Sequence, residues 1–275
     1  MQRSPATDAP KITFNDIKGA FSTQTRVISA LMLRETKTRY GLHKIGFLWA
    51  IVQPLMMVAI IVGIFSAIRS DNPGGMPLVQ FMLTGLVPFT MFRETMNQMQ
   101  GAINQNKQLF AFPQVTTFDV IFARGLLEVL LLAFVFMVLL TIIHLAGWTI
   151  NIERPLDVLA ACSLLATIGL GFGFAFASLS PLWPSMRQLS SALLGRPLFL
   201  SSGIFFTADS VPSSVRQYLL YNPLLHLLEL IRSAVFHEFE TQHGSWTYAG
   251  TWAICSLAVG LLMHQALRKR AIIGL

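Results

Sequence analysis

The chain has 275 residues, of which 53% are hydrophobic and only 12% are charged, and its formal net charge is +7. This composition excludes a soluble globular protein, because a chain of this size could not bury so much apolar surface. The positive charge does not point to nucleic acid, since most lysines and arginines flank apolar runs, where they orient a membrane protein. The two cysteines, Cys162 and Cys255, lie in separate apolar segments, so no disulfide is expected.

Residues 1–20 contain Pro5, Pro10 and scattered charges, which predict a loose cytoplasmic tail. An amphipathic helix is predicted over about residues 24–45, because its basic residues share an arc of about 80° at 100° per residue. The basic residues are Arg26, Arg34, Lys37 and Lys44, and the apolar residues opposite them are Ile28, Leu31, Met32 and Leu42. The residues Leu33, Glu35 and Arg39 break this pattern. Such a helix is typical of the membrane interface, although a basic cluster that only sets topology is the alternative.

Six membrane spans are predicted after this helix, and the first long apolar run starts only at Phe47, so no cleavable signal peptide is expected. The spans lie at about 47–68, 78–99, 114–144, 156–179, 189–206 and 246–267. Arg93 and Glu94 fall inside the second span, so their side chains are expected to face protein or the interface. The pair Arg196-Pro197 interrupts the fifth span. The fourth contains Gly169, Gly171 and Gly173, which favour close helix packing over a dinucleotide loop, because no strand precedes them.

The segment at about 207–240 is neither a clean span nor a clean loop. Its polar motif consists of Asn222, Pro223, His226, Glu229 and Arg232. These residues make a full crossing unfavourable, so two short re-entrant helices in the outer leaflet are expected. With the N-terminus in the cytoplasm, all but four of the 20 lysines and arginines lie on the cytoplasmic side. The predicted fold is therefore an all-α integral membrane protein with both termini in the cytoplasm.

Few side chains suggest chemistry. His226 and Glu229, with His237, Glu238 and His243 nearby, match no strong zinc signature, so no metal site is expected. The i, i+4 spacing of Arg124 and Glu128 predicts a local ion pair, with a proton-coupling acid as the alternative.

The sequence contains no Gly-x-x-x-x-Gly-Lys-Ser/Thr phosphate loop, so ATP would have to be hydrolysed by another polypeptide. The polar-to-aromatic segment at about 104–114 is suited to docking on such a partner. Its candidate contact residues are Lys107, Gln108, Leu109, Phe110 and Phe112. A plain connecting loop that packs its aromatic rings on the bilayer is the alternative.

Two groups of residues resemble the type-2 ABC exporter permeases. The first is Arg34-Glu35-x-Lys37-x-Arg39-Tyr40 with Gly46-x-x-Trp49-x-x-x-Gln53-Pro54, which is similar to the start of the first span in that family. The second is Ser202-Gly203-Ile204-Phe205-Phe206, Val211-Pro212 and Tyr221-Asn222-Pro223-Leu224-x-His226-x-x-Glu229-x-x-Arg232, which resembles the region before the last span. The likeness covers the chain from about residue 21 to its end as one transmembrane domain. It is greatest to the membrane subunit of Gram-negative capsular polysaccharide exporters, with the O-antigen exporters as relatives.

The resemblance implies a bacterial inner-membrane permease without catalytic, cofactor or metal residues of its own. It implies a homodimer with two ATPase subunits, which bind the ATP and Mg²⁺, and a lipid-linked polysaccharide that moves between the two copies. Periplasmic and outer-membrane export proteins would receive the polymer. The segment at 104–114 would be the coupling helix, and 207–240 would hold the periplasmic helices.

A substrate entrance is expected beside the first span, where basic side chains attract anionic headgroups and aromatic rings stack on sugars. Its residues would be Arg34, Lys37, Tyr40, Lys44 and Trp49. Two other functions stay open. One is a type-2 permease for a drug or a small lipid, and the other is a membrane-embedded lipid or glycan transferase that uses His226, Glu229 and Arg232.

Overall fold

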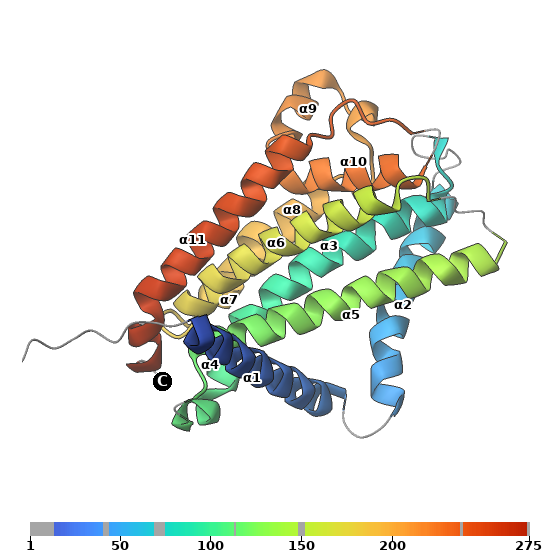
Figure 1. Cartoon of the computed structure of the whole chain (residues 1–275). Helices are drawn as coiled ribbons and strands as arrows, with labels where there is room; N and C mark the ends of the chain where they lie inside the picture. The colour runs from blue at the N-terminus through green and yellow to red at the C-terminus, as the bar shows by residue number, and fades with distance from the viewer. Residues whose placement is uncertain are drawn as a thin grey trace, which may run out of the picture.

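The computed structural model describes residues 14–40, 44–68, 75–112, 114–147, 152–236 and 239–273, and every regular element within these ranges is a helix (Figure 1). The long helices are α1 (Phe14–Tyr40), α2 (Lys44–Ile68), α3 (Leu78–Gln100), α5 (Thr117–Leu145), α6 (Pro155–Leu179) and α11 (Trp246–Ile273). The shorter α-helices are α4 (Ala102–Gln105), α7 (Met186–Ser190), α8 (Arg196–Ser201), α9 (Ser213–Leu219) and α10 (Pro223–Val235). Two 3₁₀ turns, η2 (Lys107–Ala111) and η4 (Ala208–Ser210), and one π turn, η3 (Ser191–Gly195), join them. The all-α prediction is confirmed for the described residues.

Among the described residues, three helices are long and apolar enough to cross a bilayer: α5, α6 and α11. A shorter apolar stretch, Ile51–Phe65, lies in α2. Along α5 the exposed side chains of Leu130, Phe134 and Met137 recur at helical spacing, so the exposed face of this helix is apolar from 130 to 137. Such a face is stable only against lipid or another apolar surface, which agrees with an integral membrane protein.

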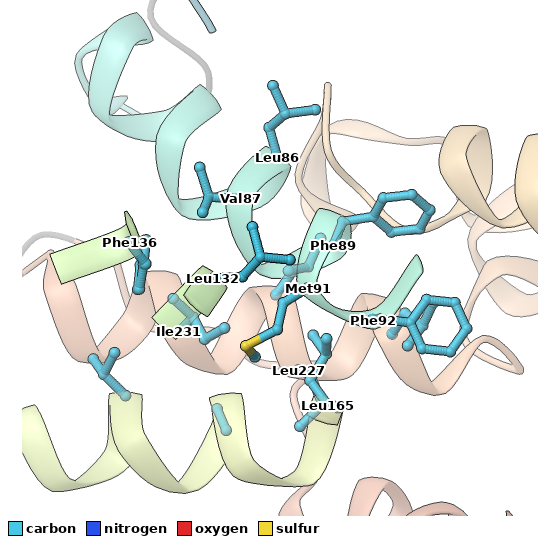
Figure 2. Close-up of a cluster of buried hydrophobic side chains, with 14 of the residues drawn as sticks. Leu86, Val87, Phe89, Met91, Phe92, Leu132, Phe136, Leu165, Leu227 and Ile231 are labelled. Atoms are coloured by element: carbon cyan, nitrogen blue, oxygen red, sulfur yellow. The ribbon is translucent and has the colours of Figure 1, made fainter. Parts of the chain in front are cut away.

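The core is organised around α3, which lies between α5 and α6 in the bundle (Figure 1). Helix α10 runs across this group and packs on α3, α6 and α11. Figure 2 shows apolar side chains from four helices meeting at this crossing. They are Leu86, Val87, Phe89, Met91 and Phe92 of α3, Leu132 and Phe136 of α5, Leu165 of α6, and Leu227 and Ile231 of α10.

The predicted close packing at the glycines of α6 is confirmed. A Cβ atom at Gly169 would lie 3.0 Å from the carbonyl oxygen of Phe92 on α3. A Cβ atom at Gly171 would collide with the backbone of Ser256 on α11, and one at Gly260 would collide with the carbonyl group of Gly171. The backbones of α6 and α11 therefore touch, as small residues allow in membrane helices.

The first helix differs from its predicted bounds. Helix α1 starts at Phe14, so it includes part of the segment expected as a tail, and residues 1–13 lie outside the described ranges. It ends at Tyr40, and Gly41, a poor helix former, follows in the sequence. Lys44 therefore begins α2 and does not extend the interface helix.

The predicted irregularity of the fifth span is confirmed, and its form is α7, η3 and α8 in succession. Pro197 has no N–H group and cannot bond to the carbonyl of Leu193 four residues earlier. The chain widens into a π turn just before this proline, where the N–H of Arg196 donates to the carbonyl of Ser191.

Candidate transport and coupling sites

Helix α1 is bound to α5 by ion pairs between buried side chains. A carboxylate oxygen of Glu35 lies 2.6 Å from Nη2 of Arg124, and Arg39 pairs with Glu128. Arg39 also lies 3.7 Å from Glu35, so the four charges form one balanced network. Arg124 and Glu128 thus each bind α1, and the local pair predicted from their i, i+4 spacing was wrong. Moving α1 away from α5 would leave buried charges without a partner, and such a change is costly. The ion pairs therefore fix the position of α1 on the bundle.

The same face of α1 contacts the segment between α3 and α5. Nη1 of Arg34 donates to the side-chain oxygen of Asn106 over 2.8 Å. Asn106 is buried, and its amide nitrogen donates to the carbonyl of Ala102, 3.0 Å away. Nearer its start, α1 places Gln24 against Asp119, which also closes the capping box with Thr116 at the start of α5. Helix α1 therefore contacts both this segment and the first turn of α5.

The structure describes the side chains of three of the five expected entrance residues. Lys37 is exposed, Arg34 is bound to Asn106, and Trp49 on α2 is 60% exposed. The side chains of Tyr40 and Lys44 lie outside the described part of the chain. Within that part, Arg34 is a link between α1 and the segment 104–114 as well as a surface charge.

The segment expected to couple to an ATPase contains α4 and η2, and it projects from one end of the bundle, beside the start of α1 (Figure 1). Lys107 and Gln108 are exposed, and Phe112 is 61% exposed. Leu109 and Phe110 instead pack on a buried cluster that includes Met99, Ile103, Val120 and Ile121. Leu109 and Phe110 therefore anchor the segment, and the aromatic ring of Phe112 faces outward. Pro113 lies outside the described residues.

The side chains of the motif before the last helix form hydrogen bonds to neighbouring loops and helix ends. Asn222 caps α10 by accepting from the N–H of Leu224, and its amide donates to the hydroxyls of Ser201 and Ser202. Pro223 occupies the first turn, where its missing N–H costs nothing. The motif therefore ties the start of α10 to the end of α8.

The charged members of the motif hold the surrounding loops. The carboxylate of Glu229 accepts from the N–H of Ala208 and from the hydroxyl of Thr241, at 3.0 and 2.8 Å. The Arg232 guanidinium donates to the carbonyls of Gly203 and Ile204, at 2.7 and 3.1 Å. Both side chains are completely buried.

Arg232 and His226 also bind the ends of other helices. The Arg232 guanidinium carbon lies 3.7 Å from the centre of the Phe81 ring on α3. Nε2 of His226 lies 2.8 Å from the carbonyl of Leu220, and its Nδ1 accepts from the N–H of Ser245. This pattern fixes a neutral imidazole with its proton on Nε2.

No group of three metal-ligand side chains comes together among the described residues, and His237 and Glu238 lie outside them. His243 instead lies 3.1 Å from Asp209 and 3.0 Å from Nη1 of Arg216.

Three adjoining hollows lie along α3, and the sequence did not predict them. The first has a volume of about 270 Å³, opens between α1, α2, α3 and α5, and has Arg39, Arg93, Glu94 and Glu128 among its polar lining residues. The other two, of about 530 and 570 Å³, lie between α3 and the α7–η3–α8 segment. The first hollow shares Arg93 and Glu94 with the second, and the second shares Asn97, Ser191 and Arg196 with the third. A signal was present at positions 93, 94 and 97, because the spacings i, i+4 and i, i+3 place these polar side chains on one side of the helix.

The sequence was also compared with known proteins. Residues 26–236 match the family model described as ABC-2 type transporter. The chain is 34% identical over 248 residues to the polysialic acid transport protein KpsM of Escherichia coli, an alignment that covers 90% of this chain and 96% of that protein. It is 33% identical to the capsule polysaccharide export inner-membrane protein CtrC of Neisseria meningitidis, covering 87% of this chain and 89% of CtrC. It is 31% identical to the capsule polysaccharide export inner-membrane protein BexB of Haemophilus influenzae, covering 92% and 95%.

Proposed function

The chain belongs to the ABC-2 type transporter family, and we propose that it is the inner-membrane permease subunit of an ATP-driven exporter of lipid-linked capsular polysaccharide. The observation that carries this proposal is similarity over 87–92% of the chain to one polysialic acid transport protein and two capsule polysaccharide export proteins from different bacteria, at 31–34% identity. An alignment that spans both the opening helix and the region before α11 favours a shared transport function over a shared fold alone.

The proposed topology has six spans with both termini in the cytoplasm. The spans are α2, α3, α5, α6, the α7–η3–α8 segment and α11. Helices α9 and α10 stay on the periplasmic side as short re-entrant helices. The burial of Arg232 and Glu229, with their bonds to loop backbone, supports this placement, because protein shields the non-helical segment from lipid.

Coupling to ATP hydrolysis is proposed to pass through the segment 104–114. Exposed Lys107, Gln108 and Phe112 would contact an ATPase subunit, while Leu109 and Phe110 hold the segment on the bundle. The bond between Arg34 and Asn106 would carry a movement of this segment into α1. Helix α1 would then act at the interface as both a coupling element and the border of the substrate entrance.

The working assembly is proposed to be a homodimer with two ATPase subunits, which supply the ATP and Mg²⁺ sites. The polymer would pass between the two copies and on to periplasmic and outer-membrane proteins. The polar hollows beside α3 support this arrangement, because polar surface at a protein's lipid boundary is costly unless water or another chain covers it.

The two alternative functions fit less well. A permease for a drug or a small lipid would share the fold but not the full-length similarity to capsule exporters. A transferase would need His226, Glu229 and Arg232 to face a substrate, whereas their polar atoms bind the backbone of neighbouring loops.

The test is deletion of this chain in its own bacterium, followed by measurement of polymer on the surface and inside the cell. We expect the surface polymer to disappear and intact lipid-linked polymer to accumulate in the cytoplasm, with restoration by the plasmid-borne chain. Loss of polymer synthesis itself would favour the transferase, and unchanged surface polymer would refute polysaccharide export.

A further inference from the structure

The two hollows between α3 and the α7–η3–α8 segment carry an excess of positive charge. Their lining includes Arg93, Arg187 and Arg196 against one carboxylate, that of Glu94. Glu94 is already paired with Arg93, since Nη2 of that arginine lies 3.1 Å from its carboxylate oxygen. The charges of Arg187 and Arg196 are therefore the ones that the lining leaves uncompensated.

Neither of these two guanidinium groups forms a hydrogen bond or an ion pair within the described part of the chain, and both side chains are exposed. Buried charges elsewhere in the bundle are engaged, such as Arg124 with Glu35 and Arg232 with loop carbonyls. The lining also offers the amides of Asn97 and Gln188. The surface therefore combines open guanidinium groups with hydrogen-bonding groups suited to sugar hydroxyls.

The hollows lie beside the hydrophobic part of the bundle. Phe92, which precedes Arg93, packs on Gly169 near the middle of the apolar helix α6. A guanidinium group at this level is unfavourable against lipid tails, and it is found where it faces a water-filled passage or an anion. Arg196 lines the same hollow as Arg93, so it is expected to face such a passage, which continues to Arg187 in the adjoining hollow.

The π turn η3 brings Ser191 and Arg196 to the side of the segment that faces α3. In a regular α-helix, residues five apart point about 140° away from each other. In η3 the wider turn bonds the N–H of Arg196 to the carbonyl of Ser191, and both residues line both hollows. The turn thus keeps Ser191 and Arg196 on the side of the segment that lines the hollows, which agrees with the frequent placement of π turns at functional sites.

We propose that Arg187 and Arg196 select the charge of the transported glycan, and that the hollows bind a polymer with regularly spaced carboxylate or phosphate groups. A guanidinium group binds either anion through two parallel N–H···O bonds, and this geometry favours arginine over lysine for the task. The amides of Asn97 and Gln188 bind the sugar hydroxyls between the charged groups. This inference rests on the proposed function, because it names the chemical class of the exported polymer.

The test uses the full chain purified with its ATPase partner, and two polymers of matched length as probes. Polysialic acid carries one carboxylate per sugar, and dextran carries none. We expect the complex to bind polysialic acid with an affinity that falls as salt rises, and to bind dextran at least about tenfold more weakly. The double variant R187Q/R196Q should lose at least about tenfold in affinity for polysialic acid, while R187K/R196K, which keeps the charges, should lose less.

The matched control is R268Q, which removes an exposed arginine of α11 outside the hollows and should leave polysialic acid binding unchanged. The thermal stability of each variant, measured on the same complex, shows whether it is folded. Equal binding of polysialic acid and dextran, or wild-type binding by a folded R187Q/R196Q complex, would overturn the inference.

Export in cells separates this inference from the proposed function. If wild-type chain exports polymer and R187Q/R196Q exports it equally well, the two arginines do not select charge and the exporter assignment stands. If the wild-type chain exports no polysaccharide at all, the proposed function fails whatever the arginines bind.

Discussion

Glu35 on α1 lies 2.6 Å from Arg124 on α5, and both side chains are buried, although 89 residues separate them in the sequence. Neither residue was expected at this contact. Glu35 breaks the amphipathic pattern of α1, and Arg124 has a nearer carboxylate four residues later. Their pairing fixes α1 against the bundle, so the helix is packed on α5 and is not a free surface helix.

Removal of Glu35 should therefore destabilise the protein. In E35Q the guanidinium of Arg124 loses its carboxylate partner in a buried site, a change that costs about 3 kcal/mol. We expect a clear fall in the thermal unfolding midpoint of the purified chain, and a smaller further fall when R124Q is added to E35Q.

The matched control is D157N, because the Arg154–Asp157 pair is exposed and exposed pairs contribute at most about 1 kcal/mol. Additive effects of E35Q and R124Q would show that the two side chains are not coupled.

The roles of Arg34 and Lys37 can be separated. The double variant R34Q/K37Q should insert normally, because other positive residues still set the topology, but it should export poorly and accumulate polymer in the cytoplasm. Arg34 contacts Asn106 and Lys37 is exposed, so the single variants report different functions.

A loss of export in K37Q supports recruitment of an anionic headgroup at the interface. A loss confined to R34Q and N106A supports mechanical coupling through their hydrogen bond. Full export by R34Q/K37Q would leave these charges as topology signals alone.

Two aromatic residues of the segment 104–114 should behave differently when replaced by aspartate. F112D removes an exposed ring, so the complex should stay folded while ATP hydrolysis becomes uncoupled from export. F110D places a charge against the buried cluster around Met99 and Ile103, so it should also lower thermal stability.

The measurement is ATPase activity and polymer export in the same membranes. Cysteines at Lys107 or Gln108 should crosslink to a cysteine-bearing ATPase subunit. Wild-type export by F112D, without any crosslinked product, would remove this segment from the coupling pathway.

The side of the membrane on which α9 and α10 lie can be measured by cysteine labelling. In a chain whose Cys162 and Cys255 are replaced by serine, single cysteines at Ser213 and at Glu240 should both react with an impermeant thiol reagent added from the periplasmic side. Both residues are exposed, so burial does not prevent the reaction.

Labelling of the Glu240 position only from the cytoplasm would mean that the segment crosses the membrane. A periplasmic reporter fused after Arg270 supplies an independent control, because it should be inactive if the C-terminus is cytoplasmic.

The helices that coincide with one long apolar run could be predicted from the sequence. The bounds of α3 and α6 and the start of α11 follow from apolar runs and their polar ends, whereas α11 continues past the predicted end at 267 to Ile273. The packing role of Gly171 follows from its small size. The pairs that join distant segments were not predictable, because a helical pattern records only neighbours along the chain. Glu35 and Arg39 therefore seemed to be defects of an amphipathic helix, when their partners lie on α5.

The candidate site was predictable only in part. Segment 104–114 was identified from its composition, yet the division between buried Phe110 and exposed Phe112 depends on the cluster beneath it. The motif around Glu229 and Arg232 was recognised as a unit, but its function in holding loop backbone required the fold. The hollows beside α3 depend on the π turn η3, and the pair Arg196-Pro197 predicted an irregularity there but not its form.

ATP-driven polymer transfer in a reconstituted system tests the central claim most directly. The chain and its ATPase partner are placed in proteoliposomes, and lipid-linked capsular polysaccharide is supplied on the side that carries the ATPase. The account predicts that ATP makes the polymer resistant to an added glycan-degrading enzyme, because the polymer enters the lumen, and that the chain without its ATPase gives no protection. Polymer that stays fully degradable while ATP is hydrolysed would contradict the account.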